Sequence, residues 1–272
     1  MRFLPAAAVL TVFFSALSGA GEPVSGQRYI PLGGTGPALH LEVVKPFVSG
    51  DGPFDGAKFA TSGWDATATY PLGSGPTLFA RMGLMYASIE GLDGSLAITN
   101  PRVGVMLGSA TGTRRGELHV DLPLATDFGE TYATGIGIFS NYEEQERFLA
   151  DTWAVGASGS SEAEAGPGAF VGTRAGGTVV VPADGSTDVY ASLALYGHAP
   201  TDQTRFRIEF SSLYLLTREG IDFTERTTFF ASLHVNWPSA RFSPTLYVRA
   251  PIDETLDATV PFVAGARLSI GS

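Results

Sequence analysis

Apolar and polar residues alternate with a period of two along most of the chain. In the stretch RTTFFASLHVNWP (226–238), the odd positions from Phe229 to Trp237 are apolar and the positions between them are mostly polar. Side chains two residues apart in a β-strand share a face, so the stretch is predicted to be a strand with one apolar face. The same pattern predicts twelve strands, at 38–44, 63–72, 77–87, 101–109, 117–124, 152–160, 169–181, 188–198, 205–216, 226–238, 241–250 and 259–270.

The links between these segments predict how the strands are connected. In the later part of the chain, tight links such as 238–241 alternate with longer polar links such as 217–226 and 251–258. Sequential strands joined in this way form an antiparallel up-and-down meander. An even number of strands places both termini and the short links on one side. The longest link contains NYEEQERFLAD (141–151), which we expect to be a short helix with solvated charges.

The residues on the polar faces indicate what surrounds the apolar faces. A soluble sandwich scatters Lys, Glu and Asp over its outer face, whereas here Arg is frequent on the polar faces and Lys is nearly absent. Arginine paired with carboxylates suits a partly desolvated interior. The most regular apolar faces carry no charge, as lipid contact requires. We therefore predict an all-β fold, a transmembrane β-barrel. The barrel must be closed because every backbone group within the membrane needs a hydrogen-bond partner. A soluble β-sandwich is the alternative.

The polar faces of such a barrel line its lumen, and aromatic residues near strand ends form an interfacial girdle. Both sets can be assigned by position in the strands. The predicted lumen or solute-binding residues are Arg81, Arg102, His119, Asp121, Arg174, Arg205, Arg207, Glu209, His234, Asn236, Arg241, Tyr247, Arg249 and Arg267. The predicted lipid-facing or girdle residues are Tyr70, Trp153, Phe229, Trp237 and Phe242.

The N-terminal sequence MRFLPAAAVLTVFFSALSGA is typical of an export signal. Arg2 precedes an apolar run from Phe3 to about Leu17, and small residues follow. This pattern predicts a signal peptide cleaved after about Ala20. The run is shorter than the ~20 residues of a spanning helix, although an uncleaved anchor is the alternative. We expect a signal peptide at 1–20, an N-terminal leader at 21–37 and the barrel at 38–272.

Taken together, these features resemble bacterial outer-membrane β-barrel proteins over the whole mature chain. The segments NPRVGV (100–105), GELHVDLPLAT (116–126), RFLADTW (147–153) and EAGPG (164–168) are similar, more loosely, to uncharacterised Gram-negative barrels grouped with small-solute transporters. The resemblance implies a porin-like location in the outer membrane of the cell envelope. It also implies contact with outer-membrane lipid and with the outer-membrane assembly machinery.

Composition limits the remaining functions. The net charge of −10 argues against a nucleic-acid partner. The chain has no cysteine, and its four histidines lie on separate segments, so no metal site or cofactor is predicted. A hydrolase would need an activated nucleophile. His119 with Asp121 and His234 with Asn236 are candidate pairs of a histidine with an orienting group, but no serine stands in a nucleophile motif, so no catalytic residue is assigned.

The arginines of the polar faces carry the functional prediction. They outnumber the acids there, which favours a passive pathway or binding cavity for small polar or anionic solutes. The alternatives are a structural or surface-interaction barrel whose lumen is closed by salt bridges, and less favourably a lumenal His-dependent hydrolase. The sequence indicates a transport protein rather than an enzyme.

Overall fold

The computed structural model describes residues 37–48, 59–73, 75–91, 93–108, 113–127, 132–201, 204–217, 226–237, 242–252 and 260–271. The predicted signal peptide, the leader up to residue 36 and Arg241 lie outside the described residues. No helix in the described part of the chain is long and apolar enough to cross a membrane.

Strands make up most of the described structure, and each of the twelve predicted segments coincides with one of them. The strands are β1 Ala38–Phe47, β2 Phe59–Pro71, β3 Thr77–Ile89, β4 Ser95–Ile98, β5 Arg102–Leu107, β6 Arg114–Asp121, β7 Thr152–Gly166, β8 Ala169–Pro182, β9 Asp188–Pro200, β10 Arg205–Leu215, β11 Thr227–Asn236, β12 Phe242–Pro251 and β13 Phe262–Gly271. Two short helices, α2 Tyr132–Ser140 and the 3₁₀ helix η2 Tyr142–Phe148, lie between β6 and β7. The predicted helix at 141–151 corresponds to η2, whereas α2 and β4 were not predicted.

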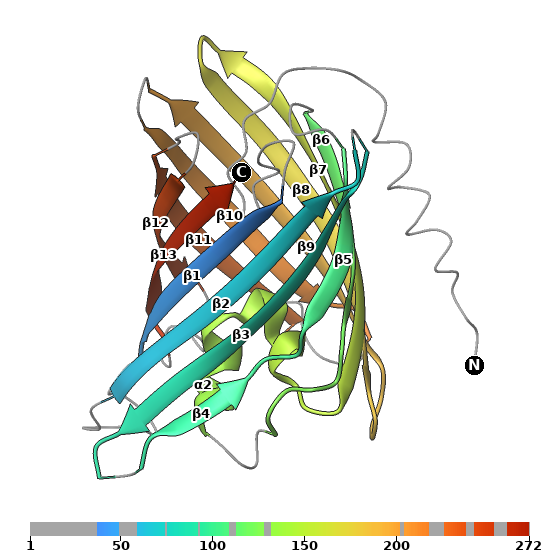
Figure 1. Cartoon of the computed structure of the whole chain (residues 1–272), viewed down its shortest axis with the longest axis vertical. Coiled ribbons are helices and arrows are strands. Elements are labelled where there is room, and N and C mark those ends of the chain that lie inside the picture. The colour runs from blue at the N-terminus through green and yellow to red at the C-terminus, as the bar shows by residue number, and fades with distance from the viewer. Residues whose placement is uncertain are drawn as a thin grey trace.

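The sheet closes on itself as an antiparallel barrel (Figure 1). The closing pair is β1 with β13, which runs in register from Ala38 opposite Gly271 to Phe47 opposite Phe262. Strands β4 and β5 share one edge of β3, with β4 beside residues 84–87 and β5 beside residues 77–81. The thirteen strands therefore occupy twelve positions around the barrel.

The two ends of the barrel differ. The first residues of β1 pair with the last residues of β13, so both lie at one end, which also carries the short turns. The links at the opposite end include the longest one, between β6 and β7. The start of β1, the end of β13 and the short links thus lie on one side, which agrees with the prediction from strand parity.

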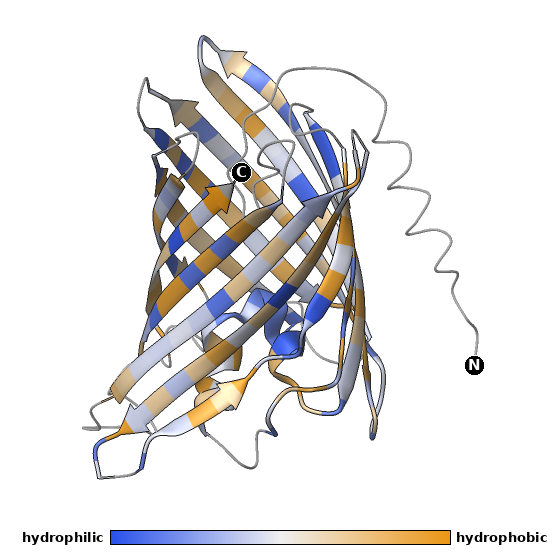
Figure 2. Ribbon diagram, in the orientation of Figure 1, coloured by the Kyte–Doolittle hydropathy of each residue, from blue (hydrophilic) through white to orange (hydrophobic). Residues whose placement is uncertain are grey.

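The exposed side chains of the wall are mostly large and apolar, and Figure 2 shows hydrophobic positions recurring along the strands. In β10, Phe206, Ile208 and Phe210 are exposed, and the residues between them are buried. The five residues predicted for the lipid face or girdle, Tyr70, Trp153, Phe229, Trp237 and Phe242, are all exposed, by 38 to 59%.

The strand pairing accommodates Pro244 of β12 without a β-bulge. Pro244 cannot donate a ladder hydrogen bond, and a bulge would be the usual accommodation. The pairs of β12 with β11 and with β13 nevertheless run without a register shift, and β11–β12 pairing begins at Thr245. Pro244 thus lies just beyond the paired part of that hairpin, where its carbonyl accepts from the Trp237 amide.

Candidate functional site

The described parts of the link between β6 and β7, residues 122–127 and 132–151, fold into the lumen at the end away from the start of β1, and we call them the insert (Figure 1). Helix α2 contributes Ala133 and Ile136, and η2 contributes Phe148, to an apolar cluster with Val44 of β1 and Met85 of β3. This burial of apolar surface fixes the helices against the inner wall. The insert therefore occupies the lumen instead of extending into solvent.

Asn100, in the break between β4 and β5, ties both ends of the insert to the wall. Its fully buried amide nitrogen donates to the carbonyls of Glu146 at 3.0 Å and Leu149 at 2.8 Å. Its oxygen accepts from the backbone amides of Leu124 at 2.7 Å and Ala125 at 2.6 Å. One side chain thus satisfies backbone groups that a helical link inside a barrel would otherwise leave unpaired.

Arg147 and Glu144 of η2 connect the insert to β2 and β3. Arg147, 1% exposed, donates to the Asp65 carboxylate at 2.7 and 3.2 Å and to the Thr99 hydroxyl at 3.1 Å. Arg81 of β3 donates to the same Asp65 carboxylate and to both oxygens of Glu144 at 3.0 and 3.1 Å. The charges alternate in sign through this network, so each buried ion has a partner.

Arg102 of β5 makes the second connection between the wall and the insert. Its guanidinium donates to both carboxylate oxygens of Asp121 at 2.7 and 2.9 Å, to Glu144 at 3.0 Å and to Glu146 at 2.6 Å. Burial is the main influence that raises the pKa of the Glu146 carboxyl. Arg102 opposes this effect, and the Asp121 and Glu144 carboxylates add to it.

On the other side of the lumen the insert reaches β10 and β12. The Glu143 carboxylate accepts from Arg249 at 3.2 Å and from the Ser211 hydroxyl, and Arg249 also donates to the Ser140 carbonyl. The expectation that the charges of 141–151 are solvated is therefore wrong for Glu143, Glu144, Glu146 and Arg147, whereas Asp151 is exposed. Because their partners lie on strands distant in sequence, the charge pattern of the segment alone could not reveal this.

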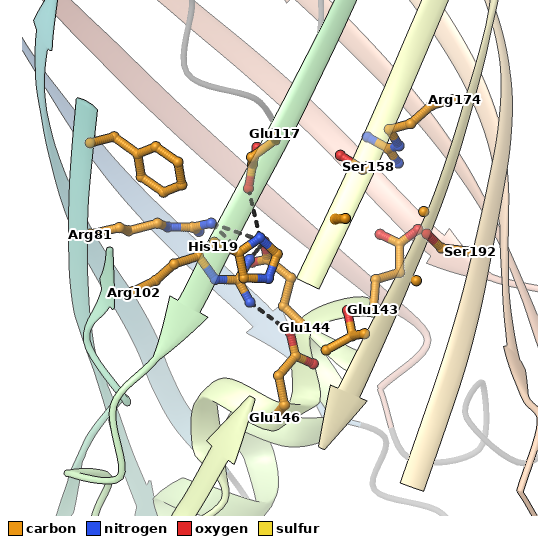
Figure 3. A pocket seen from close by; sticks show the side chains of 15 residues that line it. Arg81, Arg102, Glu117, His119, Glu143, Glu144, Glu146, Ser158, Arg174 and Ser192 are labelled. Carbon is orange, nitrogen blue, oxygen red and sulfur yellow. Dashed lines mark hydrogen bonds and ion pairs between the residues drawn. The ribbon is translucent and has the colours of Figure 1, made fainter. Parts of the chain in front are cut away.

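A cavity of about 90 Å³ remains between the insert and the wall of β6 to β9, enough for several water molecules. Figure 3 shows Arg81 and Arg102 on one side of it, Arg174 on the other, and the insert glutamates below. Apart from Arg174, the side formed by β7 to β9 consists of small residues, among them Ser158, Gly176 and Ser192. The cavity exists because these positions carry little side chain.

Two arginines of the neighbouring wall share one acid. Glu209 of β10 accepts from Arg174 of β8 at 2.8 Å and from Arg207 of its own strand. The Arg207 guanidinium lies 3.7 Å from the centre of the Tyr196 ring, and Tyr196 donates to Glu162 at 2.9 Å. This second network lies nearer the end that carries the termini.

The other predicted lumen residues occupy the same inner face. The Glu42 carboxylate accepts from Arg267 at 2.8 Å and from the Tyr247 hydroxyl at 2.5 Å. Arg205 is half-buried at the start of β10. His234 lies 3.0 Å from the Ser232 hydroxyl and stacks on Tyr247.

The two histidine pairings considered for a hydrolase are not hydrogen bonds in the structure. His119 Nδ1 contacts Glu117 at 3.0 Å instead of Asp121. The Asn236 amide donates to the Pro244 carbonyl at 3.1 Å and to Thr245 at 2.8 Å instead of to His234.

The sequence did not reveal the acids that the insert brings into the lumen. Glu143, Glu144 and Glu146 face the wall arginines, and Glu162 of β7 adds a further acid to the inner face. The apparent excess of arginine over acid is therefore offset, and the charge argument for anionic solutes is weaker than the strand pattern suggested.

Comparison with solved structures places this architecture among known barrels. A COG4313 outer membrane channel from Pseudomonas putida F1 superimposes with a TM-score of 0.58 at 11% identity, over 88% of this chain and 96% of that one. The chain has the fold of an outer-membrane β-barrel. The β-domain of the Bordetella autotransporter BrkA (TM-score 0.49, 12% identity, 87% and 99% covered) and the Ralstonia pickettii toluene transporter TbuX (0.41, 11%, 89% and 90%) are also similar.

Sequence comparison adds nothing to the structural likeness. No protein-family model matches the chain, and no curated protein matches it. At these identities the likeness shows the fold alone.

Proposed function

We propose that this barrel is inserted in the outer membrane and provides a narrow passive pathway for small polar solutes. The observation that carries the proposal is the cavity between the insert and the small-residue wall. It is lined by charged and hydroxyl side chains, and it lies where the insert narrows the lumen. A cavity of about 90 Å³ has room for several water molecules or for one small solute.

Charges of both signs line the proposed pathway. They favour neutral, cationic and anionic polar solutes alike, and do not select anions. Arg81, Arg102 and Arg174 line the cavity with Glu143, Glu144 and Glu146. Paired charges of both signs can replace the hydration of a polar solute without holding it tightly, which conduction requires. Solute identity would then be selected mainly by size.

A structural barrel with a closed lumen is the second candidate. The contacts of Asn100 and Arg249 with the insert, and of the insert residue Arg147 with Asp65, favour it, because they hold the insert from several sides of the wall. In this case the loops at the long-link end would carry the function.

Swelling of liposomes that contain the purified full-length protein separates the two candidates. With a graded series of neutral polar solutes, the pathway proposal predicts swelling that is fastest for the smallest solute and decreases steeply with size. Empty liposomes treated with the same detergent provide the background. Rates equal to that background for every solute would exclude a pathway and favour the closed barrel.

A further inference from the structure

Three buried side chains with metal-ligand chemistry meet in the lumen. His119 and Asp121 come from β6 and Glu146 comes from the insert, and one nitrogen or oxygen of each lies within 4.8 Å of the other two. The Asp121 side chain is fully buried, and the side chains of Glu146 and His119 are 6 and 9% exposed. A strand supplies two of the groups at i and i+2, and the insert supplies the third across the cavity.

The His119 ring is oriented by a carboxylate behind it. Nδ1 lies 3.0 Å from Glu117 Oε1, and the contact is a hydrogen bond when Nδ1 carries the proton. Nε2 is buried and has no hydrogen-bond partner within the described part of the chain. Figure 3 shows the ring between Glu117 above and Glu146 below. A metal-binding histidine usually donates one ring N–H to a carboxylate or carbonyl and binds the metal through the lone pair of the other nitrogen.

The charges around the ring leave acid in excess. Asp121 and Glu146 both accept from the single guanidinium of Arg102, Glu144 accepts from Arg102 and from Arg81, and Glu117 is next to His119. Like charges in a desolvated site repel one another strongly. A bound cation would offset this repulsion. Arg102 need not leave, because each carboxylate oxygen has two lone pairs and can accept a hydrogen bond while it binds a cation.

We propose that His119, Asp121 and Glu146 form a binding site for a divalent transition-metal cation in the lumen. One imidazole and two carboxylates are ligands that zinc and its first-row neighbours accept, and a fourth position would remain for water or a solute group. Ligand atoms around zinc are roughly 3.3 Å apart. The three ligand atoms, which lie within 4.8 Å of one another, would therefore approach by up to about 1.5 Å when the cation binds. The site does not depend on the barrel conducting solutes.

Direct binding of zinc to the full-length protein tests the proposal. The folded protein in detergent is first washed with a chelator, then titrated with zinc chloride in equilibrium dialysis, and bound metal is measured by mass spectrometry. We expect one zinc per chain. The isosteric substitution Glu146→Gln should weaken binding about a hundredfold. Glu117→Gln, behind the ring, should weaken it about tenfold, as loss of outer-shell partners does.

His198 provides the matched control. Its imidazole is buried on the inner wall, 3.7 Å from a single acid, Glu162, so His198→Ala should retain wild-type zinc binding. Heat-modifiable gel migration shows that each variant is folded. Absence of stoichiometric zinc on the wild type would overturn the proposal, as would equal affinity of the wild type and Glu146→Gln. Liposome swelling is a separate measurement, so failure of the pathway proposal would not affect this one.

Discussion

The guanidinium of Arg147 binds both carboxylate oxygens of Asp65, across 82 residues of sequence, and so joins the insert to β2. Arg81 binds the same carboxylate from β3. The insert is thus held by an ion-pair network that extends into the wall, in addition to the apolar packing of α2. Removing one member leaves the others buried without full compensation.

Replacing Arg147 should therefore release the insert. Arg147→Met leaves Asp65 without its main partner, and breaking a buried pair costs about 3 to 5 kcal/mol. The chain has no cysteine, so Thr134→Cys on α2, where the native side chain is 1% exposed, can report on the docked state. A maleimide should label this cysteine slowly in an otherwise native chain and rapidly beside Arg147→Met.

The control for this substitution is Arg205→Met, at a half-buried arginine of β10. It should leave labelling of the cysteine at position 134 slow. If Arg147→Met also left it slow, the ion pair would not be what holds the insert.

Asn100→Asp should destabilise the insert with almost no change in side-chain shape. The carbonyls of Glu146, Leu149 and Thr152 would face a carboxylate instead of an amide donor. Unpaired buried groups cost about 1 to 3 kcal/mol each, so we expect a loss of at least about 2 kcal/mol in unfolding free energy. Urea titration followed by tryptophan fluorescence measures it.

Asn236→Asp tests whether that loss is specific. The Asn236 amide donates to two acceptors in the β11–β12 hairpin, in a half-buried position. Its replacement should cost less than about 1.5 kcal/mol. Equal losses for both variants would mean that Asn100 has no special role.

The fold could be predicted from sequence because the wall imposes one rule on every strand. An outward residue such as Leu233 must be apolar and its neighbour Ser232 need not be, so period-two alternation reveals each strand. Strand β4 escapes this rule because its four residues are too few to show a period. Helix α2 escapes it because YATGIGIFS has few polar residues and no polar face.

Only the wall residues of the site could be predicted from the sequence, because only they follow the alternation of the strands. The wall residues, such as Arg81 and Arg102, follow from strand parity. Their partners Glu144 and Glu146 belong to the link between β6 and β7, and the sequence of this link does not indicate which strands its charged residues contact. No local pattern encodes a contact such as that between Arg147 and Asp65, so the narrowing of the lumen was not foreseen.

Filling the cavity should close the proposed pathway without unfolding the barrel. Ser158→Phe projects a ring from β7 into a space of about 90 Å³. We expect the liposome swelling rate to fall to near background for all solutes. Val155→Phe, on the exposed face of the same strand, should leave the rate unchanged. Equal swelling for the wild type and Ser158→Phe would place the pathway elsewhere.

The proposed lipid face can be tested on adjacent residues of β11. Leu233 is 49% exposed on the outer surface, whereas Ser232 lies on the inner face. Leu233→Arg should lower the unfolding free energy in phospholipid vesicles by about 2 to 4 kcal/mol, the cost of a cation near the bilayer midplane. Ser232→Arg enters the polar lumen, and its effect should be smaller. The reverse order would contradict the assignment of the apolar face to lipid.

Single-channel recording in planar bilayers tests the central claim most directly, because that claim is a pathway narrowed by the insert. The wild type should give small, steady conductance steps, and Arg147→Met should give clearly larger ones in the same salt. Absence of openings from wild-type protein shown to be folded and inserted, or identical conductance for the two proteins, would contradict it.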